Sequence, residues 1–233
     1  MKTGLKIIAI VFGSIAFAQC SVENTNANTN LTTNPDTNID PDTEVEPISR
    51  QLKYLALGDS YTIGESVCET CRFPEQLKSG LESSYPNDIF LLKIIATTGW
   101  TTTNLITAIN TQNPDSNYDL VTLLIGVNNQ YQRKPFSIYE QEFPELVATG
   151  IRLAKGYKSR LIVVSIPDYA YTPFGKRLGV ATSAIISSDL EKYNTFAKNY
   201  CMDNAIEFIN ITDITQQGFQ NPVLVAIDGL HPS

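Results

Sequence analysis

Five short apolar runs recur between residues 54 and 211, and they limit the fold of this 233-residue chain more than any other feature. Each run is rich in β-branched residues and is continuous rather than alternating, which is typical of strands in a parallel sheet covered on both faces. We therefore predict five parallel strands. The runs are 54–57, 89–96, 120–125, 160–166 and 207–211.

Stretches with helical spacing separate these runs, at residues 74–83, 103–111, 138–155 and 188–202. Pro74 suits the first turn of a helix, and Ser187 or Ser188 suits a helix cap. Alternation of strand and helix predicts an α/β fold, a three-layer α/β/α sandwich with right-handed crossovers. Ligands of such sheets bind beyond the carboxyl ends of the strands, so we expect the functional residues at that edge.

Residues 1–20 resemble a secretory signal peptide, because Lys2 and Lys6 precede an apolar stretch that ends at Ala18. The stretch is too short to span a bilayer comfortably. Cleavage after Ala18 would release the protein, whereas cleavage before Cys20 would allow lipidation, although Gln19 is unusual at that position. We expect an extracytoplasmic protein, and we favour a membrane-anchored lipoprotein over a secreted or periplasmic one.

Residues 21–49 are rich in Asn and Thr and acidic, which predicts a disordered linker, and residues 50–233 form the predicted folded domain. The whole chain carries a net charge of −7, and its first fifty residues hold three basic and six acidic side chains, leaving −4 for residues 51–233. A mildly acidic domain without a basic cluster argues against nucleic acid or an anionic membrane surface as ligand. We expect membrane contact only through the N-terminal lipid.

Three cysteines lie in the predicted domain: Cys68, Cys71 and Cys201. In an exported protein the Cys68-Glu-Thr-Cys71 segment indicates a short disulfide or two idle thiols rather than a redox pair, because it does not follow a strand in a thioredoxin-like pattern. A zinc site made of the three cysteines and a histidine is a less favoured alternative.

His231 is the only histidine, which excludes metal sites that need two imidazoles. The glycine-rich phosphate-binding motifs are absent as well, so we expect no metal and no cofactor. Asp228 precedes His231 by three residues, and at that spacing a carboxylate can accept a hydrogen bond from imidazole Nδ1 and leave Nε2 free to take a proton. The alternative is an ordinary polar turn.

Three further strand ends present small or polar residues. Ser60 follows the first run in "LALGDSYTIGES", where it is either a nucleophile or a helix N-cap. Asn128 follows the third run in "LLIGVNNQY", and its amide could donate to an oxyanion or bond its own backbone. Gly99 follows the second run in "ATTGWTTTN", where a bare backbone N–H could approach a ligand closely.

Together, "GDSYTIGE", Gly99, "GVNN" and "DGLHPS" resemble the four motif blocks of the SGNH or GDSL hydrolases, in the order of that family. The resemblance spans residues 54–233 and implies a flavodoxin-like α/β sandwich. It implies that Ser60 is the nucleophile, His231 the base and Asp228 the acid that orients it. It also implies an oxyanion hole made of the Ser60 and Gly99 N–H groups and the Asn128 side chain.

One residue departs from this pattern, because the third block commonly reads G-x-N-D and Asn129 replaces the acid here. The change puts supporting contacts in doubt rather than the activity. The G-x-S-x-G motif of the larger α/β-hydrolases is absent, which indicates a more open turn suited to modest acyl groups. Trp100 and Tyr131 are candidate walls of the cleft, with ordinary packing as the alternative.

The predicted function is hydrolysis of a small-molecule or carbohydrate ester, either by deacetylation or by cleavage of short acyl or lysolipid esters. An O-acyltransferase using the same triad and a non-catalytic surface binding module are the alternatives. Nothing in the sequence indicates which oligomeric state the protein adopts. Because Pro232-Ser233 reads like the start of a helix, we also expect that a C-terminal helix is lacking.

Overall fold

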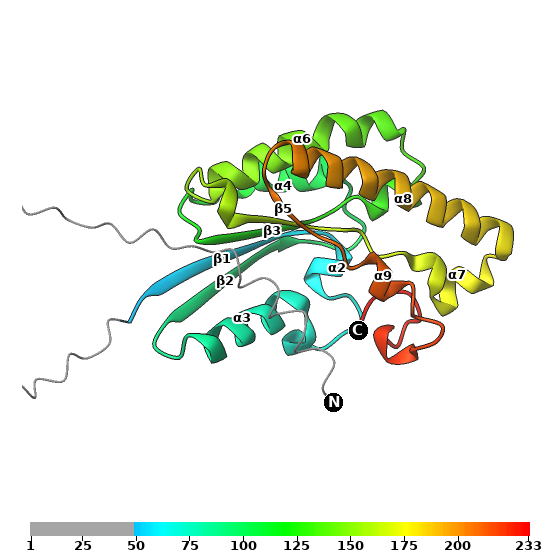
Figure 1. The fold of residues 1–233 in the computed structure, drawn as a ribbon, viewed down its shortest axis with the longest axis horizontal. Helices are drawn as coiled ribbons and strands as arrows, with labels where there is room; N and C mark the ends of the chain where they lie inside the picture. The colour runs from blue at the N-terminus through cyan, green and yellow to red at the C-terminus, as the bar shows by residue number, and fades with distance from the viewer. Residues whose placement is uncertain (1–48) are drawn as a thin grey trace, which may run out of the picture. The chain divides into compact units, whose positions relative to one another are not determined.

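All five predicted strands form, and they lie in one parallel sheet of order β2-β1-β3-β4-β5 (Figure 1). The computed structural model describes residues 49–233, so the predicted signal peptide, Cys20 and nearly all of the linker lie outside the described residues. The predicted α/β/α sandwich is confirmed. The strands are β1 Gln51–Gly58, β2 Ile89–Ala96, β3 Leu120–Leu124, β4 Leu161–Val164 and β5 Glu207–Ile209.

The register of the sheet aligns the carboxyl ends of its three neighbouring strands. Gly58, the last residue of β1, pairs with Ala96 of β2 and with Leu124 of β3. Any side chain just beyond these three residues therefore lies at the same edge of the sheet, where ligands of parallel sheets bind.

Helices cover both faces of the sheet, with α4, α6 and α8 on one side and α3 on the other (Figure 1). Pro74 lies in the first turn of α3, as predicted. The long helices are α3 Phe73–Ser84, α4 Thr102–Gln112, α6 Phe136–Leu153 and α8 Val180–Asp203. The short ones are α2 Ser60–Ile63, α5 Val127–Tyr131, α7 Pro173–Arg177 and α9 Thr212–Thr215, with 3-10 turns at Glu69–Cys71, Lys158–Arg160, Tyr169–Tyr171 and Pro222–Leu224.

The core lies between the sheet and α4, α6 and α8. Alternate residues of the central strands, such as Leu55, Leu57 and Val121, are completely buried there, and Tyr139 and Phe143 of α6 pack in the same cluster. Burying an aliphatic side chain of this size stabilises a fold by about 1.5–3 kcal/mol. This core fixes the strand ends that carry the site. Among residues 49–233, no helix is both long enough and apolar enough to cross a bilayer.

Helix α8 begins at Val180, so the predicted cap at Ser187 or Ser188 is wrong. Gly179 occupies the N-cap position, and Ser187 lies inside the helix. The Ser187 hydroxyl donates a hydrogen bond of 2.7 Å to Asp168 Oδ2. A tertiary contact of this kind satisfies a polar side chain that would otherwise favour a helix end, and local sequence gives no sign of it.

Candidate active site

Ser60, Gly99 and Asn128 follow the aligned ends of β1, β2 and β3, so the structure gathers them at one edge of the sheet. They are separated by up to 68 positions in the sequence. The parallel register is what brings them together, because each lies within four residues of a strand end.

Ser60 is the first residue of α2 and is 4% exposed. Asp59 caps the helix by accepting a hydrogen bond of 3.1 Å from the Tyr61 N–H, so the alternative interpretation of Ser60 as N-cap is wrong. The turn requires a glycine before it, because a Cβ at Gly58 would lie 2.1 Å from Thr62 Oγ1. Because Asp59 makes the cap, the Ser60 hydroxyl is not engaged in it.

The Asp59 carboxyl is fully buried beneath this turn, and within residues 49–233 its Oδ2 has no hydrogen-bond partner. Burial raises the pKa of Asp59 to about 7, against the opposing effect of the backbone N–H groups of Tyr61 and Gly126. Asp59 therefore takes up a proton on folding at weakly acidic pH, where an aspartate in the unfolded chain is ionised.

We expect the free energy of unfolding to fall as pH rises from about 4 to about 8. The native state binds the Asp59 proton up to about pH 7, whereas the unfolded state loses it near pH 4, so stability declines across that interval. The decline reaches at most roughly 4 kcal/mol. Urea unfolding between pH 5 and pH 8 measures it, and Asp59→Asn, which cannot titrate, should remove this slope. Parallel profiles for the wild type and Asp59→Asn would contradict the assignment.

Asp228 and His231 form the predicted pair, with Asp228 Oδ2 at 2.6 Å from His231 Nδ1. The other carboxylate oxygen accepts the backbone N–H groups of Leu230 at 2.8 Å and His231 at 3.0 Å. Partial burial would raise the pKa of Asp228, but these hydrogen bonds outweigh it and hold the pKa well below its ordinary value. The ionised carboxylate thus orients the imidazole.

The loop that carries this pair is anchored on both sides. Val225 and Pro232 form an antiparallel bridge, and the Ala226 N–H donates to the His231 carbonyl at 2.7 Å. The His231 side chain is 12% exposed. A predicted helix beyond Ser233 is therefore not needed to explain how the histidine is held; its presence stays a prediction.

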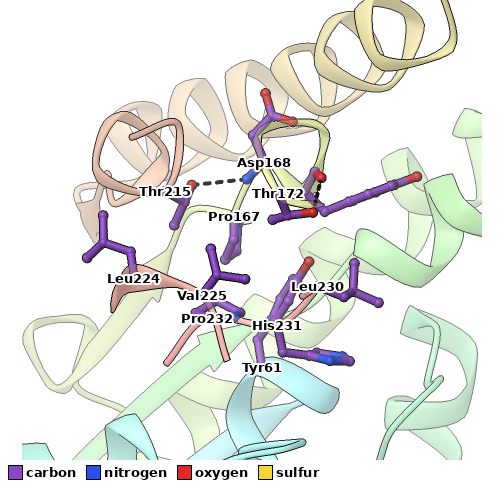
Figure 2. A pocket seen from close by; sticks show the side chains of 11 residues that line it. Tyr61, Pro167, Asp168, Thr172, Thr215, Leu224, Val225, Leu230, His231 and Pro232 are labelled. Atoms are coloured by element: carbon purple, nitrogen blue, oxygen red, sulfur yellow. Dashed lines mark hydrogen bonds between the residues drawn. The ribbon is translucent and has the colours of Figure 1, made fainter. Parts of the chain in front are cut away.

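The imidazole packs beside α2, the helix that Ser60 begins. The His231 ring meets the Tyr61 ring edge-on, with centroids 5.7 Å apart, and Tyr61 directly follows Ser60 (Figure 2). Ser66, in the loop after α2, places its hydroxyl by the Asp228 carboxylate and helps to lower its pKa. Sequence reasoning missed Ser66, because no local pattern connects it to a residue 162 positions away.

The two candidate oxyanion donors are held together. Asn128 Nδ2 donates to the Trp100 carbonyl at 3.0 Å, which uses one of its two N–H bonds and fixes the orientation of the amide. Gly99 has a φ of +85°, and a Cβ there would meet nothing within 4 Å, so its backbone borders open space. Gln132 Nε2 donates to the Gly99 carbonyl at 3.0 Å. The second N–H of Asn128 remains for a ligand, as an oxyanion donor would require, and the oxyanion role stays a prediction.

Asn129, where the family pattern has an acid, keeps a supporting role. It is fully buried, its Oδ1 accepts the Thr102 N–H at 3.0 Å, and its Nδ2 donates to Thr102 Oγ1 at 2.7 Å. The Thr102 hydroxyl in turn donates to Glu142 on α6. The doubt about supporting contacts is thus resolved, and Glu142 is a second residue that sequence reasoning missed.

The two predicted cleft walls differ in their surroundings. Trp100 is partly buried and packs against the core cluster, whereas Tyr131 is 55% exposed with its ring edge-on to Tyr169 at 6.1 Å. A hollow lined by Tyr61, Asp168 and His231 has a volume of about 10 Å³, which is room for about one water (Figure 2).

The three cysteines of the described residues, Cys68, Cys71 and Cys201, do not form a metal site. Cys68 and Cys71 are joined in a disulfide with a Cα–Cα distance of 4.9 Å, and Cys201 is a free thiol buried in the core. The zinc alternative is therefore wrong, because two of its sulfurs bond to each other. The part of the chain that the structure describes holds no cluster of three or more metal-ligating side chains.

Comparison with known proteins agrees with the fold described above. The profile of the GDSL-like Lipase/Acylhydrolase family matches residues 56–233. Among solved structures, the fold is similar to an acetyl xylan esterase from Geobacillus stearothermophilus (18% identity, TM-score 0.57) and a lipase/acylhydrolase from Enterococcus faecalis (17%, 0.56). It is also similar to the esterase EstA from Pseudoalteromonas sp. (14%, 0.52). Each alignment covers 78% of this chain and 87% of the other. No curated protein matches the chain.

Proposed function

Because this chain belongs to the GDSL-like lipase/acylhydrolase family and is a carboxylic ester hydrolase, we propose that it cleaves its ester in two steps through an acyl-serine on Ser60. The observation that carries the proposal is the hydrogen-bonded Asp228–His231 pair packed against the helix that Ser60 begins. A serine hydroxyl is a weak nucleophile until a neighbouring base takes its proton.

In the first step, His231 Nε2 accepts the Ser60 proton while Oγ attacks the carbonyl carbon of the ester. The resulting oxyanion receives hydrogen bonds from the Ser60 and Gly99 N–H groups and from the second N–H of Asn128. The imidazolium then gives its proton to the departing alkoxide, and the acyl-serine remains. Asp228, ionised throughout, stabilises the positive imidazole.

In the second step, His231 Nε2 takes a proton from water, and the hydroxide attacks the acyl carbonyl. The same oxyanion donors stabilise the second tetrahedral intermediate. As it collapses, the imidazolium returns the proton to Ser60 Oγ, and the carboxylic acid leaves. Neither of these two reaction steps changes an oxidation state or uses a cofactor.

Asn128→Ala tests the oxyanion part of the proposal. We expect kcat to fall by roughly 10²–10³-fold, which corresponds to the loss of one oxyanion donor. The loss of the bond to Trp100 acts in the same direction. Turnover of p-nitrophenyl acetate measures the effect, and Asn110→Ala, an exposed asparagine on α4, is the matched control. Equal rates for Asn128→Ala and the control would refute this role.

We propose short acyl groups on small alcohols or carbohydrates as the substrates. The absence of the G-x-S-x-G motif indicates an open turn at Ser60, which supports an acyl group of modest size. The exposed Tyr131 ring supports a carrier that packs against an aromatic surface. Rates for acetylated sugars against p-nitrophenyl esters of increasing chain length test this choice.

We also propose that the enzyme acts outside the cytoplasm, attached through a lipid on Cys20. The composition of residues 1–20 supports this location. The Cys68–Cys71 disulfide supports it too, because disulfides persist in oxidising compartments. Membrane fractionation of cells that express the full chain, compared with Cys20→Ala, tests both parts.

A further inference from the structure

A chain of hydrogen bonds connects α6 to the amino end of α4 and to α5. The buried Asn129 amide of α5 binds Thr102 twice, through the Thr102 N–H at 3.0 Å and through Oγ1 at 2.7 Å. Thr102 begins α4, and its hydroxyl donates to Glu142 of α6. In this arrangement Thr102 Oγ1 accepts one N–H of the Asn129 amide, and its only hydrogen goes to the Glu142 carboxylate.

Glu142 supplies the single charge of this group. Its carboxylate also accepts from Thr103 Oγ1, at 2.7 Å to Oε1. Thr102 and Thr103 are the first two residues of α4, where the helix dipole favours a negative charge. The two hydroxyls and the amino end of α4 thus stabilise this charge, which lies on α6, an element that carries none of the predicted site residues.

The same chain of bonds leads to both oxyanion donors. Asn129 directly follows Asn128, and Thr102 lies three residues after Gly99. Asn128 itself reaches the intervening residue Trp100 through its bond of 3.0 Å. A shift of Thr102 relative to Asn129 would therefore move the Gly99 N–H relative to the Asn128 amide. Misplacement of a reacting group by about 1 Å can cost 10²-fold in rate.

We propose that Glu142 is a positioning residue, which holds Gly99 and Asn128 in register through Thr102 and Asn129. The inference rests on the function proposed above. It has a specific consequence, because Thr102 Oγ1 has one hydrogen to donate. A carboxylate can accept that hydrogen at position 142 or at position 129, and carboxylates at both positions compete for it and repel each other.

The test exchanges the charge between the two positions. We expect Asn129→Asp to lower kcat roughly ten-fold with KM changed by less than about two-fold, since positioning of the oxyanion donors is lost. In the Asn129→Asp/Glu142→Gln protein, the new carboxylate at position 129 can accept both the N–H and the hydroxyl of Thr102, so kcat should return to at least the value of Glu142→Gln alone. Glu140→Gln, an exposed residue of α6, is the matched control and should equal the wild type.

Kinetics and urea unfolding of the wild type, the two single variants and the double variant distinguish the outcomes. An Asn129→Asp protein that folds poorly and regains both stability and kcat in the double variant supports the proposal. Equal effects of Asn129→Asp in the wild-type and Glu142→Gln backgrounds overturn it. The proposal is also overturned if the two substitutions are coupled in the free energy of unfolding while all four proteins have the same kcat. Glu142 would then have a structural role only. Failure of the proposed function is recognised separately, by a Ser60→Ala protein that retains wild-type turnover.

Discussion

Ser60→Ala should lower kcat by at least roughly 10⁴-fold, since removal of the nucleophile leaves only binding and the oxyanion donors to act on the ester. The fold should be unaffected, because Asp59 rather than Ser60 caps α2 and the Ser60 side chain is small. Initial rates with p-nitrophenyl acetate measure the loss, and a melting curve verifies the fold.

Ser79→Ala provides the control for this experiment, as Ser79 is an exposed serine on α3 away from the sheet edge. It should retain wild-type turnover. If Ser60→Ala keeps more than about one hundredth of the wild-type kcat, another group is the nucleophile and the proposed mechanism is wrong.

Asp228→Asn should have the second largest effect, a fall in kcat of roughly 10⁴-fold. The amide oxygen can replace Oδ1 and still accept the Leu230 and His231 N–H groups, so the loop should keep its shape. The amide nitrogen then lies opposite His231 Nδ1 and donates to it. This places the ring proton on Nε2, where it blocks acceptance of the Ser60 proton, and it removes the negative charge that stabilises the imidazolium.

The control for this change is Asp213→Asn, an exposed aspartate of α9, which should behave as the wild type. The two variants carry the same change in net charge, so any difference in kcat between them comes from the position of the substituted residue. An Asp228→Asn protein within about ten-fold of the wild-type kcat would mean that another residue orients the histidine.

Much of this fold could be predicted because its signals are local. Continuous apolar runs of four to eight residues marked every strand, and turn residues at their ends marked the sheet edge. The Asp228–His231 pair was also predictable, since three positions of spacing bring the two side chains together without tertiary help. Ser60, Gly99 and Asn128 followed from the rule that parallel strands end at one edge.

The rest depends on contacts between distant segments. The start of α8 was misplaced because Ser187 is satisfied by Asp168, which belongs to another element. Two supporting contacts join residues that are distant in the sequence. Ser66 lies 162 positions before Asp228, and Glu142 lies 40 positions after Thr102. Neither Ser66 nor Glu142 lies in a motif. A single sequence contains no local signal for such pairs.

The central claim is that His231 activates Ser60 as the nucleophile. Peptide mapping by mass spectrometry, after reaction of the active wild-type enzyme with a p-nitrophenyl phosphonate, tests it most directly. We expect one phosphonyl group per chain, located on Ser60, with loss of turnover in proportion to labelling. A fully inactivated enzyme whose phosphonyl group lies on another residue, or full labelling of Ser60 with turnover intact, would contradict the account.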